Sequence, residues 1–465
     1  MHTLRKFFSL IIMLLYVCPF FAQENKWRLP DSPTGKAAAA LLDAIDAGDA
    51  VAAEAFINSY FAPELRNHFS MEDHLRMFGR IQSNLAAPEL LDIKKSAPFQ
   101  VTMTVRGGER GEVLEIQFEL SADPPHQMVN FGVDAPAAKM THFRNIAELD
   151  AYLQAETAAN RFSGAVLVAK GGQPLYQKAF GLASKRYDVP NRIDTKFNIG
   201  SINKEFTATA IAQLQEKGKL NLDDPIATYL PEYPKEVADK VTIRQLLRHE
   251  SGMGHYWNDA WDARKGHIRT VSELIETFKD EPLLFEPGSR QQYSNAGYVV
   301  LGAIIEQVSG QNYDDYLREH IFRPAGMNDT EAYEMDRPVP NLATGYTNWQ
   351  PDGGEGEGYQ RNNLFLMGLK GSPAGGGYST LKDLLKYDQA LKAGKFFADN
   401  AAASRLVTGG GGLGIAGGAP GCNAILESDW EAGYTVVVLS NYDPPTAEDL
   451  GLEIMHMLRQ EGQEE

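Results

Sequence analysis

The stretch from residue 197 to residue 217, FNIGSINKEFTATAIAQLQEK, constrains the fold most, because it sets a serine and a lysine on one turn of a predicted helix. Ser201 and Lys204 are three positions apart, and residues at that spacing share one face of an α-helix. Apolar side chains recur at helical spacing after them, and Gly218 is expected to end the helix. Gly200 allows close approach of another segment just before the serine. A serine becomes a nucleophile when a neighbouring base accepts its proton, and burial can lower the pKa of a lysine enough for that role.

Ser-x-x-Lys is a short motif, and the chain contains it a second time at Ser379 to Lys382. Ser379 and Thr380 follow three glycines and precede an apolar-periodic run, which is the pattern of a helix N-cap. Asp383, three positions after Thr380, would complete a capping box. We interpret this second occurrence as the start of a helix, so the assignment of Ser201 depends on further motifs.

The composition is that of a globular protein with enough apolar material for a large core. Of the 465 residues, 43% are hydrophobic and 23% are charged, and the length suggests two or three domains. A formal net charge of −17 disfavours nucleic-acid binding, because phosphate recognition needs a basic surface. The cysteines are Cys18 and Cys422, and one is expected to leave with the leader, so we expect no internal disulfide.

Residues 1–22 have the layout of a secretory signal peptide. Basic residues precede an almost unbroken apolar run from Phe7 to Val17, which is too short to span a bilayer. We expect cleavage after Ala22 and a periplasmic or secreted protein, with lipid attachment at Cys18 as the less favoured alternative. No later stretch approaches the length of a membrane span, so we expect no transmembrane anchor in the mature chain.

Residues 24–134 are predicted to form a small α+β domain. Three segments have the composition and spacing of helices: 37–47, 51–61 and 71–85. From Phe99 the period changes to two, and Gly107-Gly108 turns the chain between two alternating strands. This order resembles that of NTF2-like domains, a similarity of pattern alone. A spacer role is favoured, and a ligand pocket or a dimerisation surface remains open.

Residues 145–462 are predicted to form a larger α+β domain, joined to the first by a linker at 135–144. Strand patterns lie near both of its ends, at 162–180 with a turn at Gly171-Gly172, and at 423–427 and 435–440. Helix patterns fill the middle and the C-terminus, including 296–308, 313–322 and 446–459. Strands at both ends around a helical middle predict an antiparallel sheet backed by helices.

A second motif, Tyr293-Ser294-Asn295, precedes the helix pattern at 296–308. A tyrosine whose phenolate is stabilised by a lysine can act as a general base and later as an acid to the leaving group. An asparagine amide can bond both a lysine and a substrate carbonyl. Alone, the tripeptide is more typical of a surface turn that feeds a helix.

Taken in order, these motifs resemble the serine β-lactamase and penicillin-binding-protein-like family of class C type, which includes D-aminopeptidases, D-Ala-D-Ala carboxypeptidases and esterases. The resemblance covers residues 145–460. It rests on the stretches FNIGSINK at 197–204, GKLNLDDP at 218–225, IRQLLRHESGM at 243–253, YSNAGY at 293–298 and SNY at 440–442. It implies a β-lactamase/transpeptidase-like fold and an acyl-serine mechanism, with no metal and no cofactor.

The resemblance also implies a role for individual residues. Ser201 would be the nucleophile, Lys204 and Tyr293 the shared acid and base, and Asn295 a positioning group. The backbone N–H groups of Ser201 and Gly418 would form an oxyanion hole. Donors of this kind each lower the barrier by roughly 3–4 kcal/mol when they point at the developing charge.

The sequence departs from the family at the third motif. The family places lysine or histidine, a small residue and glycine on the strand beside the serine, whereas here Ile415, Ala416 and Gly417 take these positions. That cation normally holds the carboxylate of penicillins and D-Ala peptides, and burying an anion against isoleucine would leave it unpaired. We therefore expect an ester or amide substrate without a carboxylate at that point, unless Arg248 or Arg290 supplies the charge.

The remaining candidates have ordinary structural interpretations. His249, Glu250 and His255 lack the His-Glu-x-x-His spacing of a zinc site, and we expect hydrogen-bonded, non-ligating histidines. The aromatic side chains between 256 and 261 could line a cleft or pack in the core.

Three functions remain open at this point. The favoured one is an exported acyl-serine hydrolase with a small-molecule or peptide substrate, of esterase or D-amino-acid peptidase type. A non-catalytic ligand- or peptidoglycan-binding relative is favoured by Ile415 alone, and a true β-lactamase is the third. The sequence does not determine the oligomeric state.

Overall fold

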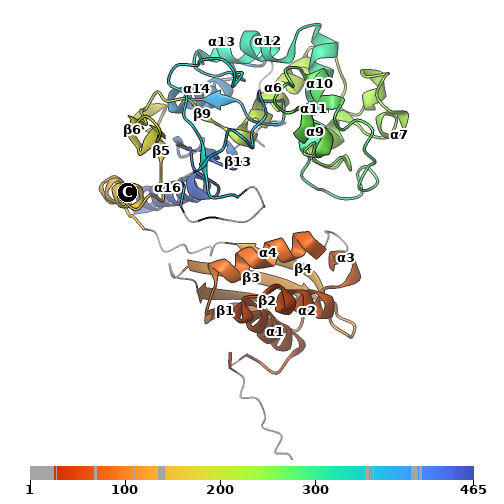
Figure 1. The fold of residues 1–465 in the computed structure, drawn as a ribbon, viewed down its shortest axis with the longest axis vertical. Coiled ribbons are helices and arrows are strands. Elements are labelled where there is room, and N and C mark those ends of the chain that lie inside the picture. The colour runs from red at the N-terminus through yellow and green to blue at the C-terminus, as the bar shows by residue number, and fades with distance from the viewer. Residues whose placement is uncertain are drawn as a thin grey trace, which may run out of the picture. The chain divides into compact units, whose positions relative to one another are not determined.

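The computed structural model describes residues 26–27, 29–66, 71–107, 112–134, 142–350, 356, 358–359, 361–398, 407 and 411–464. The chain forms two compact units, residues 1–140 and 141–465, and each is described by itself (Figure 1). Within these described ranges, no helix combines the length and the apolar character needed to cross a membrane. The predicted signal peptide and most of the predicted linker lie outside the described residues.

In the first unit, helices come before an antiparallel sheet. The helices are α1 (Pro33–Ala47), α2 (Ala50–Tyr60), α3 (Pro63–Arg66) and α4 (Met71–Asn84). The four strands follow in the order β1-β2-β3-β4: β1 (Glu89–Ala97), β2 (Gln100–Gly107), β3 (Glu112–Leu120) and β4 (Met128–Asp134). Alternate strand residues such as Met103 and Ile116 share one core with Leu41 and Phe78 of the helices, because side chains along a strand point alternately to its two faces.

The sequence predicts the two central strands of this sheet and misses the two edge strands, β1 and β4. The edge strand β1 reads ELLDIKKSA, and its charged residues interrupt the apolar alternation on which the prediction depends. Charges on edge strands are common, because they discourage pairing with another chain. Gly107 ends β2 as expected, and the rest of the predicted turn lies outside the described residues. The likeness to NTF2-like domains stays a prediction.

The second unit is built on an antiparallel sheet of five strands in the order β13-β14-β15-β5-β6. These strands are β5 (Gly164–Lys170), β6 (Gln173–Phe180), β13 (Gly414–Ala419), β14 (Cys422–Asp429) and β15 (Tyr434–Ser440). Gly171 and Gly172 make the turn between β5 and β6, both with positive φ, where the sequence predicts it. Strands from the two ends of the domain pair directly through β15 and β5. The edge strands of this sheet are β13 and β6.

Both faces of this sheet are covered. On one face, Leu167, Leu426 and Val437 belong to the large core that contains helix α6 (Asn203–Glu216) and helix α14 (Leu381–Lys392). On the other, Val168, Ile425 and Val436 pack against α5 (Ile146–Ala158) and α16 (Thr446–Glu464). Because both faces of the sheet are buried, its inner strands are almost continuously apolar rather than alternating. The predicted antiparallel sheet backed by helices is confirmed.

The helical part of the second unit fills the middle of the chain (Figure 1). Its remaining helices are η1 (Gly200–Ile202), η2 (Ile226–Thr228), α7 (Lys235–Ala238), α8 (Ile243–Leu247), α9 (Asp259–Arg264), α10 (Val271–Ile275), α11 (Asn295–Ser309), α12 (Tyr313–Leu317), η3 (Arg318–Phe322) and α13 (Arg323–Ala325). Short strands complete it: β7 (Leu182–Ser184), β8 (Val189–Pro190), β9 (Phe197–Asn198), β10 (Tyr346–Thr347), β11 (Arg361–Asn362) and β12 (Tyr378–Ser379). The single helix predicted over 313–322 is α12 followed by one π turn, η3. Gly218 adopts φ +64 just after α6, as expected of a helix stop.

Candidate active site

Ser201 lies in a tight turn between strand β9 and helix α6. The 3₁₀ turn η1 carries the serine, and Lys204 lies in the first turn of α6. The side chain of Asn198 accepts a hydrogen bond from the Gly200 N–H at 2.9 Å, which fixes the turn. The two side chains of the motif therefore meet, with Lys204 Nζ 3.3 Å from Ser201 Oγ.

The Tyr293-Ser294-Asn295 motif lies at the start of helix α11 and reaches the same point. Ser294 caps α11 by accepting from the N–H three residues later. Tyr293 Oη donates to Ser201 Oγ at 2.7 Å, and Asn295 Oδ1 accepts from Lys204 Nζ at 2.8 Å. The four side chains predicted from the sequence are thus linked in one chain of hydrogen bonds, in the order Tyr293, Ser201, Lys204 and Asn295.

Burial sets the electrostatics of Lys204. The lysine is 3% exposed, and this desolvation lowers its pKa from 10.5 to about 7. The Ala374 carbonyl accepts from Nζ, and the Tyr293 ring lies with its centroid 4.7 Å away. Both contacts favour the ammonium form, so burial outweighs them. Partial burial also raises the pKa of Tyr293, although the hydrogen bond with Ser201 acts to lower it. Near neutral pH, the lysine is therefore the better base and the phenol the better acid.

Edge strand β13 runs beside the serine, and glycines allow that approach. A Cβ on Gly417 would lie 2.6 Å from the Ser201 nitrogen, so a side chain does not fit there. Ala419 pairs with Cys422 across a two-residue turn, and the pair that closes such a hairpin is of the hydrogen-bonded kind. The Gly418 N–H therefore points away from β14, toward the open edge of the sheet. Gly200 approaches it closely, since a Cβ on Gly200 would lie 2.7 Å from the Gly418 nitrogen. The two proposed oxyanion donors thus lie where β13 meets η1.

An apolar side chain occupies the strand position where the resemblance implies a cation. Ile415 is partly buried and packs against the core that contains α6, whereas Ala416 packs on the opposite face of the sheet. Arg290 stacks on the ring of Phe285 at 4.3 Å, and Arg248 is exposed to solvent.

The two histidines near the site are hydrogen-bonded, as predicted. His249 Nδ1 accepts from the Ser294 N–H at 3.2 Å, and burial lowers the pKa of His249 to about 4. His255 Nδ1 lies 3.1 Å from the side-chain nitrogen of Asn295, and burial also lowers the pKa of His255. Both rings are therefore neutral at physiological pH. Among the described residues, no group of three or more His, Cys, Asp or Glu side chains is arranged to hold a metal.

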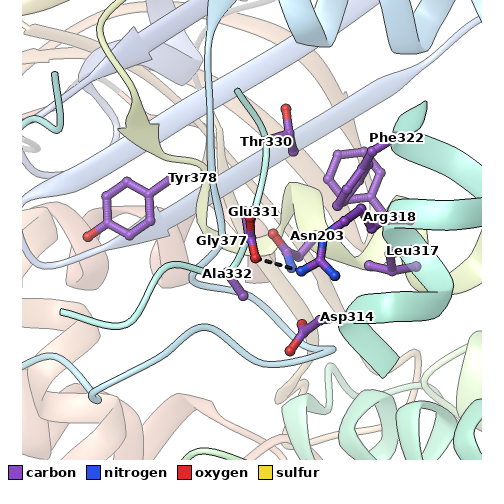
Figure 2. A pocket seen from close by; sticks show the side chains of 11 residues that line it. Asn203, Asp314, Leu317, Arg318, Phe322, Thr330, Glu331, Ala332, Gly377 and Tyr378 are labelled. Atoms are coloured by element: carbon purple, nitrogen blue, oxygen red, sulfur yellow. Dashed lines mark hydrogen bonds and ion pairs between the residues drawn. The ribbon is translucent and has the colours of Figure 1, made fainter. Parts of the chain in front are cut away.

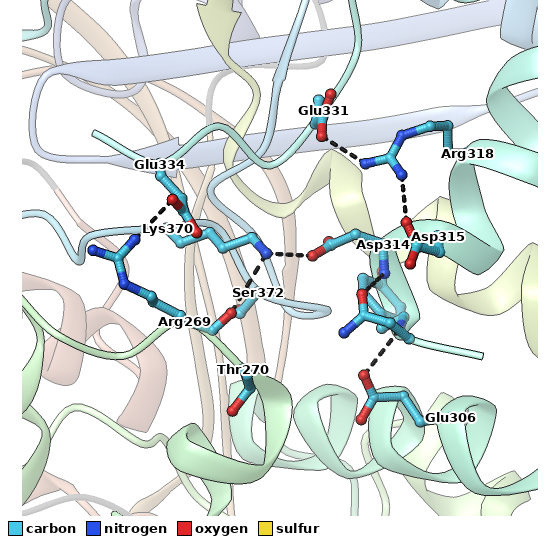
Figure 3. A network of polar contacts seen from close by, with 12 residues as sticks. Arg269, Thr270, Glu306, Asp314, Asp315, Arg318, Glu331, Glu334, Lys370 and Ser372 are labelled. Atoms are coloured by element: carbon cyan, nitrogen blue, oxygen red, sulfur yellow. Dashed lines mark hydrogen bonds and ion pairs between the residues drawn. The ribbon is translucent and has the colours of Figure 1, made fainter. Parts of the chain in front are cut away.

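A segment that the sequence analysis does not select, the strap of residues 370–377, supplies the carbonyl that contacts Lys204. Thr207 of α6 donates to the Pro373 carbonyl at 2.8 Å, next to Ala374. Lys370 forms an ion pair with Asp314 of α12 at 2.5 Å, within the polar network of Figure 3. The glycine density of this segment, GSPAGGG at 371–377, was the signal available in the sequence.

A small cavity lies between α6, α12 and the segment from Thr330 to Ala332. Its volume is about 10 Å³, and Asn203, Asp314, Arg318 and Glu331 are among the residues that line it (Figure 2). That is room for about one water molecule. A substrate cannot enter it, and the candidate site at Ser201 rests on the side-chain geometry described above.

The second Ser-x-x-Lys is a helix start, as interpreted, with two corrections. Thr380 caps α14 by accepting from the Asp383 N–H at 3.3 Å. Ser379 is not a cap: it lies in β12, and its hydroxyl bonds Thr330 at 2.8 Å. The capping box is also wrong, because the Asp383 carboxylate accepts from the Asp329 N–H instead.

Comparison with known proteins agrees with this fold and geometry. The β-lactamase family profile matches residues 146–455. The chain is 33% identical over 296 residues to a putative penicillin-binding protein, PbpX, of Bacillus subtilis, which spans 60% of this chain and 70% of that protein. It is 31% identical over 333 residues to the esterase EstB of Burkholderia gladioli, spanning 65% of this chain and 81% of that one. The structure of a penicillin-binding protein from Bacillus halodurans superposes with a TM-score of 0.57 at 27% identity, over 66% of this chain and 99% of the other.

The fold is that of a penicillin-binding-protein-like serine hydrolase. With the profile match over 146–455, the chain belongs to the β-lactamase family.

Proposed function

We propose that this protein is an exported serine hydrolase that forms an acyl-enzyme at Ser201 from an uncharged ester or amide. One observation carries the proposal: a single hydroxyl lies 3.3 Å from an amine and 2.7 Å from a phenol. The pKa of that amine is about 7, so near pH 7 about half of it is neutral and able to accept a proton.

In the acylation step, Ser201 Oγ bonds to the substrate carbonyl carbon while its proton moves to neutral Lys204. The carbonyl oxygen becomes an oxyanion, to which the Ser201 and Gly418 N–H groups donate. When this intermediate collapses, the bond from carbon to the leaving oxygen or nitrogen breaks. Tyr293 gives its hydroxyl proton to the leaving group, and the Lys204 ammonium returns a proton to the phenolate.

In the deacylation step, a water molecule attacks the acyl carbon. The same amine and phenol accept its proton and return one to Ser201 Oγ. The products are a free acid and the original enzyme. This cycle predicts that kcat/KM rises with pH through about 7, as Lys204 loses its proton, and falls only at alkaline pH, where Tyr293 ionises.

The substrate assignment rests on Ile415. An anionic group beside it would lose its hydration without gaining a partner, which is costly. An ester or amide that is uncharged at this point pays no such cost. The esterase activity named for one relative agrees with this assignment.

The test is covalent labelling with a fluorophosphonate, together with hydrolysis of short-chain p-nitrophenyl esters. Ser201→Ala should lose both, whereas Ser379→Ala, the matched serine of the second Ser-x-x-Lys, should keep both. Labelling that survives Ser201→Ala refutes the nucleophile assignment. No labelling of the unmodified protein favours the binding-protein alternative, and nitrocefin turnover as fast as ester turnover contradicts an uncharged substrate.

Export is a separate part of the proposal and is supported by the leader-like layout of residues 1–22. Protein recovered from the periplasm or the medium of a bacterial host should begin at Gln23. An intact N-terminus in the cytoplasmic fraction would contradict export.

A further inference from the structure

Three large exposed side chains lie at or near the phenol that donates to Ser201, and together we call them the apolar rim: Trp257, Leu284 and Tyr293. They are 55%, 55% and 44% exposed, respectively. Single exposed apolar residues are common on protein surfaces. A group of them beside a nucleophile is a different case, because contiguous apolar surface marks binding sites.

The rim is connected through the segment from Gly254 to Trp257. The Trp257 ring stacks on His255, with centroids 5.4 Å apart and planes 7° from parallel. His255 in turn lies 6.3 Å from the Tyr293 ring, centroid to centroid. Leu284 lies over Gly254, with Cδ1 3.3 Å from where a Cβ of that glycine would be. The three side chains therefore border one stretch of surface.

Neighbouring contacts hold the rim in place. Tyr256 is buried and its hydroxyl lies 3.4 Å from Ser372 Oγ of the strap. The Gly254 carbonyl accepts from the Ser294 hydroxyl at 2.9 Å. The Leu284 N–H donates to the Gly252 carbonyl at 2.7 Å. An aromatic side chain that is exposed yet anchored loses little conformational entropy when a ligand packs on it.

The chemistry of the rim is uncharged. His255, which supports Trp257, is neutral at physiological pH. Tyr293 carries the hydroxyl that protonates the leaving group in the proposed mechanism, so the rim borders the leaving-group side of the site. Offset or edge-on packing against Trp257 favours another aromatic ring.

We propose that the apolar rim binds an aromatic group on the leaving alcohol or amine of the substrate. This inference rests on the proposed function and adds the class of substrate: uncharged esters or amides of aryl-substituted alcohols or amines.

The test compares two esters with the same acyl group, 2-phenylethyl acetate and ethyl acetate. The specificity ratio, kcat/KM for the first over kcat/KM for the second, should fall about tenfold in Trp257→Ala, which corresponds to about 1.4 kcal/mol. Trp257→Phe should keep most of the ratio. Tyr187→Ala, which removes an aromatic side chain that is 73% exposed elsewhere, should leave it unchanged.

The outcomes separate the inference from the function on which it rests. If the unmodified protein hydrolyses both esters through Ser201 and the ratio is unchanged in Trp257→Ala, the inference is wrong. It is also wrong if the loss appears instead with ethyl phenylacetate, which carries the ring on the acyl side. A shift in the pH midpoint of ethyl acetate hydrolysis would show that Trp257 acts through His255 and Asn295, and would refute a binding role. No Ser201-dependent turnover of either ester refutes the proposed function itself.

Discussion

Asn295→Asp tests whether the protonation of Lys204 governs activity. The Asn295 oxygen lies 2.8 Å from Lys204 Nζ, so the substitution places a carboxylate in contact with the amine at almost no change in volume. An opposite charge at this distance raises the pKa of a lysine by about 1–3 units. His255 contacts the same side chain and would share the new charge by gaining a proton, so we expect a shift of about 1–2 units.

The magnitude follows from the neutral fraction of Lys204. Its pKa of about 7 leaves about half of it neutral at pH 7. A pKa of about 8–9 would leave roughly 10% to 1% neutral, so kcat/KM at pH 7 should fall about 5- to 50-fold. The loss should be recovered at pH values above the new midpoint, because Tyr293 still holds its proton there.

The assay is Ser201-dependent ester hydrolysis from pH 5.5 to 9.5, with kcat/KM fitted to a midpoint. Asn145→Asp is the matched control, because Asn145 caps α5 through the N–H groups of Ala147 and Glu148, and aspartate caps equally well. An Asn295→Asp midpoint that stays near 7, or moves to lower pH, would refute the assignment of Lys204 as the base.

Three further predictions concern the strand edge and the strap. Ile415→Lys should raise the ratio of the nitrocefin rate to the ethyl acetate rate about 10- to 100-fold, since a hydrogen bond from the new ammonium to the substrate carboxylate contributes about 1.5–3 kcal/mol. An unchanged ratio would show that residue 415 does not face the substrate. Gly417→Ala should lower kcat about 100-fold or more, because the new Cβ would lie 2.1 Å from a backbone oxygen and displace the oxyanion donors. Gly411→Ala is the control and should leave kcat unchanged, because the space around Gly411 is open. Lys370→Met removes the ion pair of Asp314, whose side chain is only partly buried, so thermal unfolding at pH 7.5 should show a loss of about 1–3 kcal/mol. Burial already raises the pKa of Asp314. The loss of stability should therefore be smaller at pH 5, where more of this carboxyl is protonated. An equal loss at both pH values would contradict this account.

Local sequence determined the elements that build the second unit. Helix α6, the β5–β6 hairpin and helix α11 follow from the spacing of apolar residues and from glycine and serine at their ends. These signals lie within about 15 residues, which is the range over which helical and strand periodicity is encoded. The order of motifs around Ser201 was enough to indicate the family, and the family profile confirms it.

Tertiary structure alone decided how these elements combine at the site. Tyr293 donates to a hydroxyl 92 positions earlier in the chain, and the Ala374 carbonyl reaches Lys204 across 170 positions. The glycine density at 371–377 marks the strap as a segment of interest, but no local pattern specifies its contact with Lys204, since a backbone carbonyl carries no side-chain signature. The pKa of Lys204 is likewise a property of the packed structure, because desolvation depends on how completely distant segments exclude water from the amine. The sequence names a serine and a lysine on one turn of helix, and only the packing of α11, β13 and the strap around them gives the lysine a pKa at which it can act as a base.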